Sequence, residues 1–227
     1  MKHILRCHDF LKDDIIRGDN CYLYDRDNNR YVDFESGVWC AVVGHANPRV
    51  NRRMTEQISK LTHLGPGYTN HLAEEAALSL LETLPVKDGK CVFLSSGSEA
   101  VEFGITAAKL ATGKKLMLTL SESYLGAYGS AGRKTEDWTT IDFDDCFRCE
   151  ETECLLSCKN LEELNFDKTA AFVFEPGSSF GKVKFASKKL IRLLAEETRN
   201  SGGLLVVDEV TTGFGRTGKW HGFNHYD

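Results

Sequence analysis

Four short apolar runs, separated by stretches with a helical pattern, constrain the fold of this chain more than any other feature. The runs are CVFL at 91–94, LMLTL at 116–120, AFVFE at 171–175 and LLVVD at 204–208. Apolar residues at helical spacing occupy 99–112 and 188–200. Strands that alternate with helices predict a mostly parallel α/β sheet, whose ligands bind beyond the carboxyl ends of the strands.

The residues before this region predict a scaffold. Alternating apolar and polar residues over 20–34 predict a β-hairpin that turns around Asn28. Asn47 and Pro48 are typical of a helix start, and this helix is expected to continue to about Leu61. A second helical pattern covers 71–84.

Two predicted strand ends carry residues suited to a charged ligand. SSGSEA follows the CVFL run and begins a helix, so the N–H groups around Gly97 and Ser98 would favour an anion such as phosphate. An ordinary capped helix is the alternative interpretation. Asp208 ends a strand that is apolar at every position, so its carboxylate emerges into a desolvated environment and requires a cation.

The glycines at 213, 215 and 218 resemble two nucleotide-binding motifs, and both interpretations fail on context. A dinucleotide-binding turn would follow its strand directly and lead into a helix, whereas DEVTT intervenes and the aromatic-rich KWHGFNHYD follows. A P-loop needs Ser or Thr after its lysine, and Trp220 follows Lys219 here. What remains is an acid that needs a cation beside a phosphate-binding helix end. Pyridoxal 5'-phosphate (PLP) carries both a phosphate and a ring nitrogen that an aspartate keeps protonated.

At this point the sequence resembles the class III, fold-type-I aminotransferases. DEVTTGFGRTG is similar to their DEVQTGFGRTG segment, and SSGSEAVE is similar to their phosphate-cup motif, SGTEANE. The segment 18–50 resembles their opening hairpin with its SGI-type and GHxHPxV segments, SESYLGAYGS resembles SYHG, and FEP resembles their EP turn. The resemblance runs from about Gly18 to Asp227, with the segments in the same order. It implies an α/β fold of the PLP-dependent transferase fold type I, a three-layer mostly parallel sheet that is incomplete at the carboxyl end.

The resemblance also implies roles for individual residues in cofactor binding. Asp208 would pair with the pyridine nitrogen, and Tyr124 would stack on the ring. Gly97 and Ser98 would donate backbone N–H groups, and Ser98 its hydroxyl, to the phosphate. Glu175 would face the cofactor edge or hold the neighbouring loop.

Other positions depart from the family pattern or concern the substrate. Thr211 replaces the glutamine that reaches the phenolic oxygen of the cofactor, and its hydroxyl would donate from a different distance. Leu125 replaces a histidine, and Phe180 replaces an acid that some relatives use in handling the substrate. Trp39 is expected to line the substrate pocket.

The Schiff-base lysine of the family is expected beyond Asp227, and Lys219 is too close to Asp208 in sequence to be that lysine. Residues 1–45 are expected to form an amino-terminal segment with a β-hairpin that belongs to the small domain. Residues 46–227 would form the first part of the large PLP-binding domain, without the carboxyl-terminal small domain. The expected reaction is transfer of an amino group from an amino acid or amine to a 2-oxo acid, in a protein that is a homodimer when complete. The alternatives are a fragment, a split enzyme or non-catalytic partner chain, and an aminomutase or racemase of the same fold.

Composition limits the remaining possibilities. The net charge is -5 and the basic residues are scattered, which argues against nucleic acid or an anionic membrane as a partner. Without a membrane-spanning apolar run or a signal peptide, a cytoplasmic location is expected. Four of the eight cysteines lie close together, at 146, 149, 154 and 158. They are either metal ligands or reduced thiols on a surface connection, and their role stays open.

Overall fold

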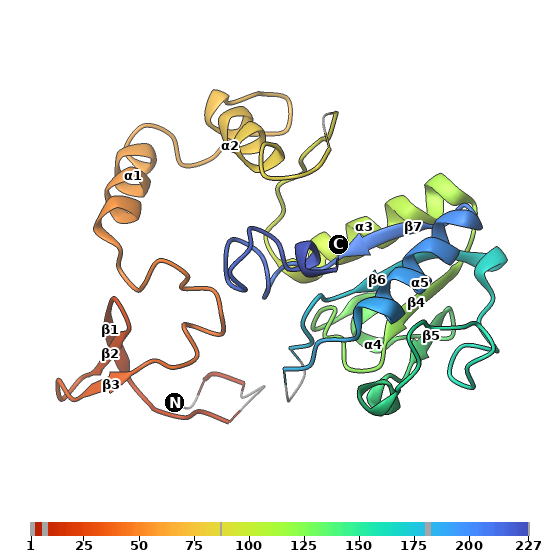
Figure 1. The fold of residues 1–227 in the computed structure, drawn as a ribbon. Coiled ribbons are helices and arrows are strands. Elements are labelled where there is room, and N and C mark those ends of the chain that lie inside the picture. The colour runs from red at the N-terminus through yellow and green to blue at the C-terminus, as the bar shows by residue number, and fades with distance from the viewer. Residues whose placement is uncertain (1–2, 6–8, 87, 180–182, 227) are drawn as a thin grey trace. The chain divides into compact units, whose positions relative to one another are not determined.

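The structure is a computed structural model that describes residues 3–5, 9–86, 88–179 and 183–226 (Figure 1). The chain divides into two compact units, Met1–Ala76 and Ala77–Asp227. The division at residues 45 and 46 expected from the sequence concerns the domains of the complete protein and stays a prediction.

The amino-terminal unit contains a three-stranded antiparallel sheet. Strands β1 (Ile15–Asp19), β2 (Tyr22–Asp25) and β3 (Arg30–Val32) pair in the order β1-β2-β3, which confirms the predicted hairpin. The carboxylate of Asp25 accepts hydrogen bonds from the backbone and side-chain amides of Asn29 and from the hydroxyl of Tyr31. These bonds lower the pKa of Asp25 to about 2, and the bond from the Asn29 side chain contributes most. The turn is therefore fixed by its own polar groups.

Two helices follow the hairpin. Helix α1 (Pro48–Ile58) begins as predicted, because the side chain of Asn47 accepts from the N–H groups of the first turn. Helix α2 (His71–Leu81) lies across the boundary between the units. Neither helix has a buried residue, and Val50, Met54 and Ile58, spaced by four along α1, are all exposed. Most of the buried apolar surface therefore belongs to the second unit.

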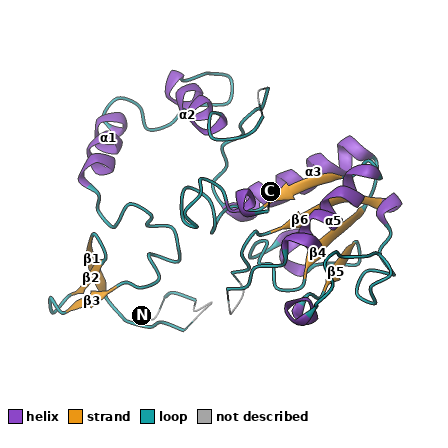
Figure 2. Cartoon of the chain, viewed as in Figure 1, coloured by secondary structure: helices purple, strands orange, loops and turns teal. Residues whose placement is uncertain are grey.

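The carboxyl-terminal unit contains a parallel four-stranded sheet. Its strands β4 (Leu116–Leu120), β5 (Trp138–Ile141), β6 (Thr169–Phe174) and β7 (Leu204–Val207) lie in the order β5-β4-β6-β7 (Figure 2). The helices are α3 (Gly97–Thr112), α4 (Gly129–Arg133) and α5 (Lys188–Asn200). Short 3-10 helices cover Asp144–Arg148, Phe166–Lys168 and Gly222–His225.

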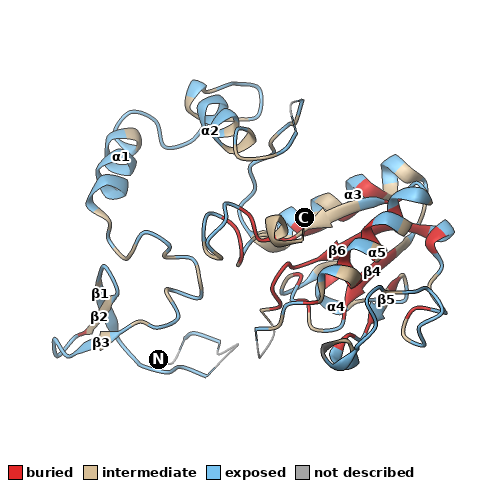
Figure 3. Cartoon of the chain, viewed as in Figure 1, coloured by how far each residue is buried: buried red, intermediate tan, exposed pale blue. Residues whose placement is uncertain are grey.

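Alternate residues of the strands pack against helices on opposite faces of this sheet. Leu118 and Phe172 belong to an apolar cluster with Leu194 of α5, whereas Met117 and Val173 belong to a cluster that includes residues of α3. Figure 3 shows the buried residues concentrated in the central strands. The predicted three-layer parallel α/β architecture is confirmed.

One predicted strand is wrong. Residues 91–94 form no strand, and Val92, Phe93 and Leu94 are exposed. An isolated strand leaves its N–H and C=O groups unpaired, and among the described residues this run has no neighbouring strand. At one edge of the parallel sheet lies β7, whose first residue, Leu204, is also exposed.

Candidate functional site

The amino-terminal turn of α3 presents free backbone donors. The side chain of Ser96 accepts from the N–H of Glu99, and the carboxylate of Glu99 accepts from the N–H of Ser95. In the described part of the chain, the N–H groups of Gly97 and Ser98 have no protein acceptor. The geometry is therefore that of an anion-binding helix end with a complete cap beside it.

The loop after β4 lies against this helix end. The N–H of Ala127 donates to Oγ of Ser98 at 3.0 Å. Gly126 has a φ of +132°, and a Cβ atom there would lie 2.9 Å from the same oxygen. Glycine is therefore required for this close approach.

The same loop is fixed to the end of β6 by Glu175. This side chain is 3% exposed, and its Oε2 accepts from the N–H of Tyr124 at 2.6 Å. Its Oε1 accepts from the hydroxyl of Ser179, also at 2.6 Å. Burial raises the pKa of Glu175 to about 7, although these hydrogen bonds oppose the shift; the nearby charge of Asp208 adds to it.

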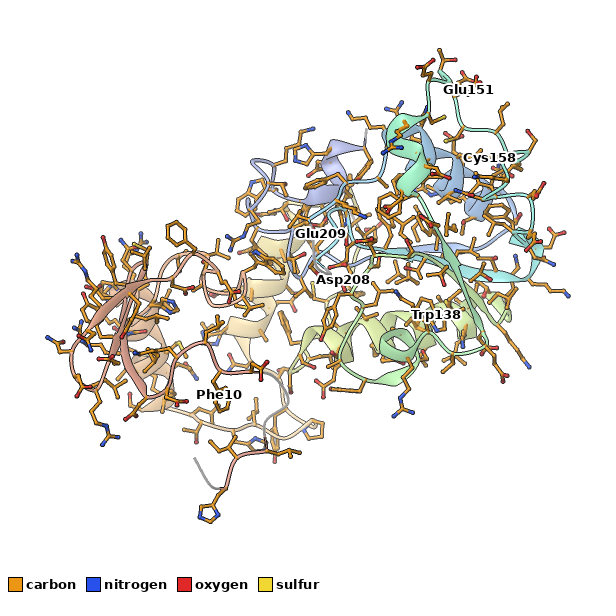
Figure 4. All side chains as sticks on the ribbon, turned by 90° about the horizontal axis from the view of Figure 1, so that it is seen from below. Phe10, Trp138, Glu151, Cys158, Asp208 and Glu209 are labelled. Carbon is orange, nitrogen blue, oxygen red and sulfur yellow. The ribbon has the colours of Figure 1, made fainter. Side chains whose placement is uncertain are left out.

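Asp208 follows β7 and is the second buried acid of this region (Figure 4). Asp208 is 7% exposed, and its Oδ1 accepts a hydrogen bond from the N–H of Val210 at 3.0 Å. Burial, with a smaller contribution from Glu209, raises its pKa to about 6. No ion-pair partner for Asp208 occurs among the described residues, so the carboxylate has the uncompensated position predicted from sequence.

These contacts connect the segments that carry the predicted cofactor residues. A Cβ atom on Gly97 would lie 2.7 Å from Cγ2 of Val210, so the start of α3 lies against the segment after β7. Ser98 contacts the loop that carries Tyr124, that loop contacts Glu175, and Glu175 interacts electrostatically with Asp208. The structure thus brings together the predicted residues from the ends of β4, β6 and β7 and from the start of α3. Tyr124 is half-exposed, with 46% of its surface accessible.

The two adjacent threonines after Asp208 have different environments. Oγ1 of Thr211 is buried, and it has no hydrogen-bond partner in the described structure. Thr212 donates to the carboxylate of Glu209 at 2.8 Å, and Glu209 also accepts from the N–H groups of Gly222 and Phe223. Glu209 is therefore satisfied within the protein, whereas Thr211 retains a free hydroxyl.

Three other sequence expectations lie outside this set. Trp39 belongs to the amino-terminal unit, where its N–H donates to the carbonyl of Glu35, and its role at the substrate pocket stays a prediction. Leu125 is buried, with 1% of its surface accessible, so it fills space where the family has a histidine. Phe180 lies outside the described residues.

Sequence analysis missed residues that hold the site in place. The carboxylate of Glu102 accepts from the hydroxyl of Ser130 and the N–H of Ala131 at the start of α4. Lys134 donates to the carbonyls of Ser121 and Ser123, just before Tyr124. The position of Glu102, four residues after Ser98 and so on the same helix face, was the available signal; no comparable pattern marks Lys134.

Comparison with known proteins identifies the family. The family described as aminotransferase class-III matches residues 7–227. The chain belongs to this family. Among similar proteins of the family are a [LysW]-aminoadipate semialdehyde/glutamate semialdehyde transaminase of Sulfolobus acidocaldarius, 30% identical over 94% of this chain, and an acetylornithine aminotransferase of Archaeoglobus fulgidus, 32% identical over 99%.

Solved structures agree with this assignment. An S-selective transaminase from Arthrobacter sp. with alanine bound superposes with a TM-score of 0.87 at 25% identity, over 99% of this chain and 57% of its own. A taurine:2-oxoglutarate aminotransferase from Bifidobacterium kashiwanohense, in complex with PLP and glutamate, gives the same TM-score at 21% identity, over 100% of this chain and 57% of its own, and shows the shared fold. The chain spans 55% of the length of the Sulfolobus relative and 60% of that of the Archaeoglobus relative. PLP is the cofactor of class-III aminotransferases.

No helix in the described residues is long and apolar enough to cross a membrane.

Proposed function

We propose that this chain supplies the phosphate-binding helix end, the ring-binding loop and the aspartate of a PLP-dependent aminotransferase. The complete protein would transfer an amino group from an amino acid or amine to a 2-oxo acid and would act as a homodimer. The observation that carries this proposal is Asp208, a buried carboxylate at the end of β7 that has no counter-ion among the described residues.

The residues present fit the cofactor. A buried acid whose pKa is raised by burial gains most from a cation at its free oxygen, and a protonated ring nitrogen is such a cation. The N–H groups of Gly97 and Ser98 have no acceptor among the described residues and suit a phosphate. The buried, unpaired hydroxyl of Thr211 suits an oxygen acceptor such as the phenolic oxygen.

When bound, PLP supplies an electron sink for chemistry at the α-carbon of an amino acid. Ionised Asp208 would hold the proton on the ring nitrogen, because the pair is desolvated and therefore strong. Tyr124 would cover one face of the ring, and Glu175 would hold Tyr124 in place through the hydrogen bond to its backbone N–H. Trp39 would line the substrate pocket.

The relatives support transfer over the alternative reactions. Those named above are aminotransferases, and none is an aminomutase or racemase. Because the names of these relatives give different substrates, the amino donor of this protein has to be determined by assay. The exposed stripe of Val50, Met54 and Ile58 on α1 is consistent with burial in a dimer of the complete protein.

Cofactor titration tests the proposal directly. PLP added to the purified chain should produce a saturable change in its absorption spectrum, and Asp208→Asn should abolish or strongly weaken this change. Asp167→Asn, at an exposed position of a 3-10 helix in the same unit, is the matched control and should titrate like the wild type. Equal affinity in both variants would contradict the role of Asp208. In the complete protein, ping-pong kinetics with a 2-oxo acid would support transfer.

A further inference from the structure

A cluster of thiols lies apart from the cofactor residues, on the segment between β5 and β6. Cys146, Cys149, Cys154 and Cys158 line a single cavity of about 390 Å³. None of the predicted cofactor residues lines it. Figure 4 shows Glu151 and Cys158 on this segment, away from the labelled Asp208. The assigned activity gives the cluster no role.

Two of these thiols, those of Cys146 and Cys149, lie at the two ends of a single turn. Cys146 lies in the 3-10 helix Asp144–Arg148, and the N–H of Cys149, which caps this helix, donates to the carbonyl of Cys146. Residues three apart in a 3-10 turn project from the same side, and the Cα atoms at the ends of such a turn lie within about 7 Å. This separation falls in the range that a disulfide spans. All the cysteines in the described residues are free thiols here.

The two thiols differ in environment. Cys146 is half-buried and packs against the apolar cluster on the α5 face of the sheet; burial raises the pKa of its thiol. Cys149 is exposed, and Nζ of Lys189 lies 3.4 Å from its Sγ. Lys189 also donates to the carbonyls of Cys149 and Glu151, so the ammonium group is held beside this sulfur. A fixed cation and solvent access are the features of a nucleophilic cysteine.

A metal centre does not match this arrangement. In the part of the chain that the structure describes, no group of three or more His, Cys, Asp or Glu side chains is placed to hold a metal ion. Formation of a disulfide involves only two neighbouring thiols, so the four sulfur atoms need not surround a common point.

We propose that Cys146 and Cys149 form a redox-active dithiol that hydrogen peroxide oxidises to an intramolecular disulfide, with Cys149 as the attacking sulfur. The Cys149 thiolate attacks one peroxide oxygen, so that an S–O bond forms, the O–O bond breaks and the hydroxide released takes a proton to become water. The Cys146 thiolate then attacks the sulfur of Cys149. The S–S bond forms, the S–O bond breaks, and the hydroxide released takes a proton and leaves as a second water. The two thiols lose two electrons and peroxide gains them.

Peroxide oxidation followed by thiol alkylation and peptide mass mapping tests the proposal. Cys21 and Cys40, two exposed thiols elsewhere in the chain, serve as references. In the reduced full chain, the peptide with a Cys146–Cys149 disulfide should form several times faster than either reference thiol is oxidised. Cys149→Ser should leave Cys146 as an alkylatable thiol. The double variant Cys154→Ser/Cys158→Ser should still form the disulfide.

The lysine provides a matched comparison. Lys189→Met should slow formation of the disulfide several-fold and Lys189→Arg should largely restore it, whereas Lys188→Met, an exposed neighbour on the same helix, should react like the wild type. Oxidation of Cys146 and Cys149 at the rate of Cys21, or pairing of Cys149 with Cys158 instead, would overturn the proposal. So would a stoichiometric metal ion, measured by elemental mass spectrometry, that protects all four thiols from alkylation.

Discussion

The backbone N–H of Tyr124 donates a 2.6 Å hydrogen bond to Oε2 of Glu175, 51 residues further along the chain. This bond joins the loop after β4 to the end of the neighbouring strand β6. Because Glu175 is buried and accepts this bond, the position of the Tyr124 backbone depends on Glu175. The loop that carries Tyr124 is therefore fixed by a buried side chain at the end of β6.

Replacing this acceptor should weaken cofactor binding. At about pH 8 we expect Glu175→Gln to lower PLP affinity roughly tenfold, because a charge-assisted hydrogen bond is worth about 1.5–3 kcal/mol and the amide cannot accept through both its terminal atoms. Spectroscopic titration measures the affinity. Glu162→Gln, at an exposed position, is the control. An unchanged dissociation constant for Glu175→Gln would show that the loop is held by other contacts.

The buried acids should make the cofactor-free chain less stable as the pH rises. Burial raises the pKa of Asp208 to about 6 and that of Glu175 to about 7, so the folded state binds protons more tightly than the unfolded state. The free energy of unfolding should therefore fall between about pH 4 and pH 7 and then level off. Urea denaturation at several pH values measures this slope.

Removing one of these acids should reverse part of the effect. At about pH 8, Asp208→Asn should stabilise the cofactor-free chain by roughly 2 kcal/mol, and near pH 4 it should change stability little. The same variant should lose cofactor binding. Equal destabilisation at both pH values would mean that the asparagine disrupts packing instead.

Adjacent threonines provide a paired test of function against stability. Thr211→Val removes a buried hydroxyl with no partner, so the free energy of unfolding should stay the same or rise while PLP affinity falls. Thr212→Val removes the donor to Glu209 and should destabilise by about 1–3 kcal/mol. Thermal unfolding of both variants, with and without PLP, separates the two effects. A large loss of stability in Thr211→Val would reveal a structural hydrogen bond.

Glu102 and Gly129 should show non-additive effects. Gly129 has a φ of +82°, and a Cβ atom there would lie 2.4 Å from Oε1 of Glu102. Gly129→Ala should therefore destabilise the chain through both backbone strain and this clash. In a Glu102→Ala background only the strain remains, so the cost of Gly129→Ala should be smaller. Equal costs in the two backgrounds would exclude the clash.

The periodicity of the sequence predicted the strands that pair with a neighbouring strand. The runs LMLTL, AFVFE and LLVVD form strands as predicted, because each pairs with a neighbouring strand of the sheet, and Asn47 caps α1 as predicted. The run CVFL is also apolar, but among the described residues no strand pairs with it. A local pattern specifies the tendency to form a strand, whereas hydrogen bonding to a neighbour decides it.

For the candidate site, the sequence indicated residues whose chemical type suits one kind of ligand group. A carboxylate at the end of an apolar strand identified Asp208, and the helix start identified Gly97 and Ser98. Glu102 and Lys134 were missed because they act on backbone groups of the loop and not on a ligand. Such contacts depend on how α3 and α4 approach one another, which spacing within a single helix does not encode.

The amino-terminal unit forms its hairpin and first helix almost without an interior: among its described residues, only Asp25 is buried. Polar contacts in water contribute little net free energy, so these elements should open and close on their own, without unfolding of the sheet. Their amide hydrogens should exchange with deuterium early, well before those of the fully buried β6. In this chain the first 76 residues would then open and close on a shorter timescale than the rest of the fold.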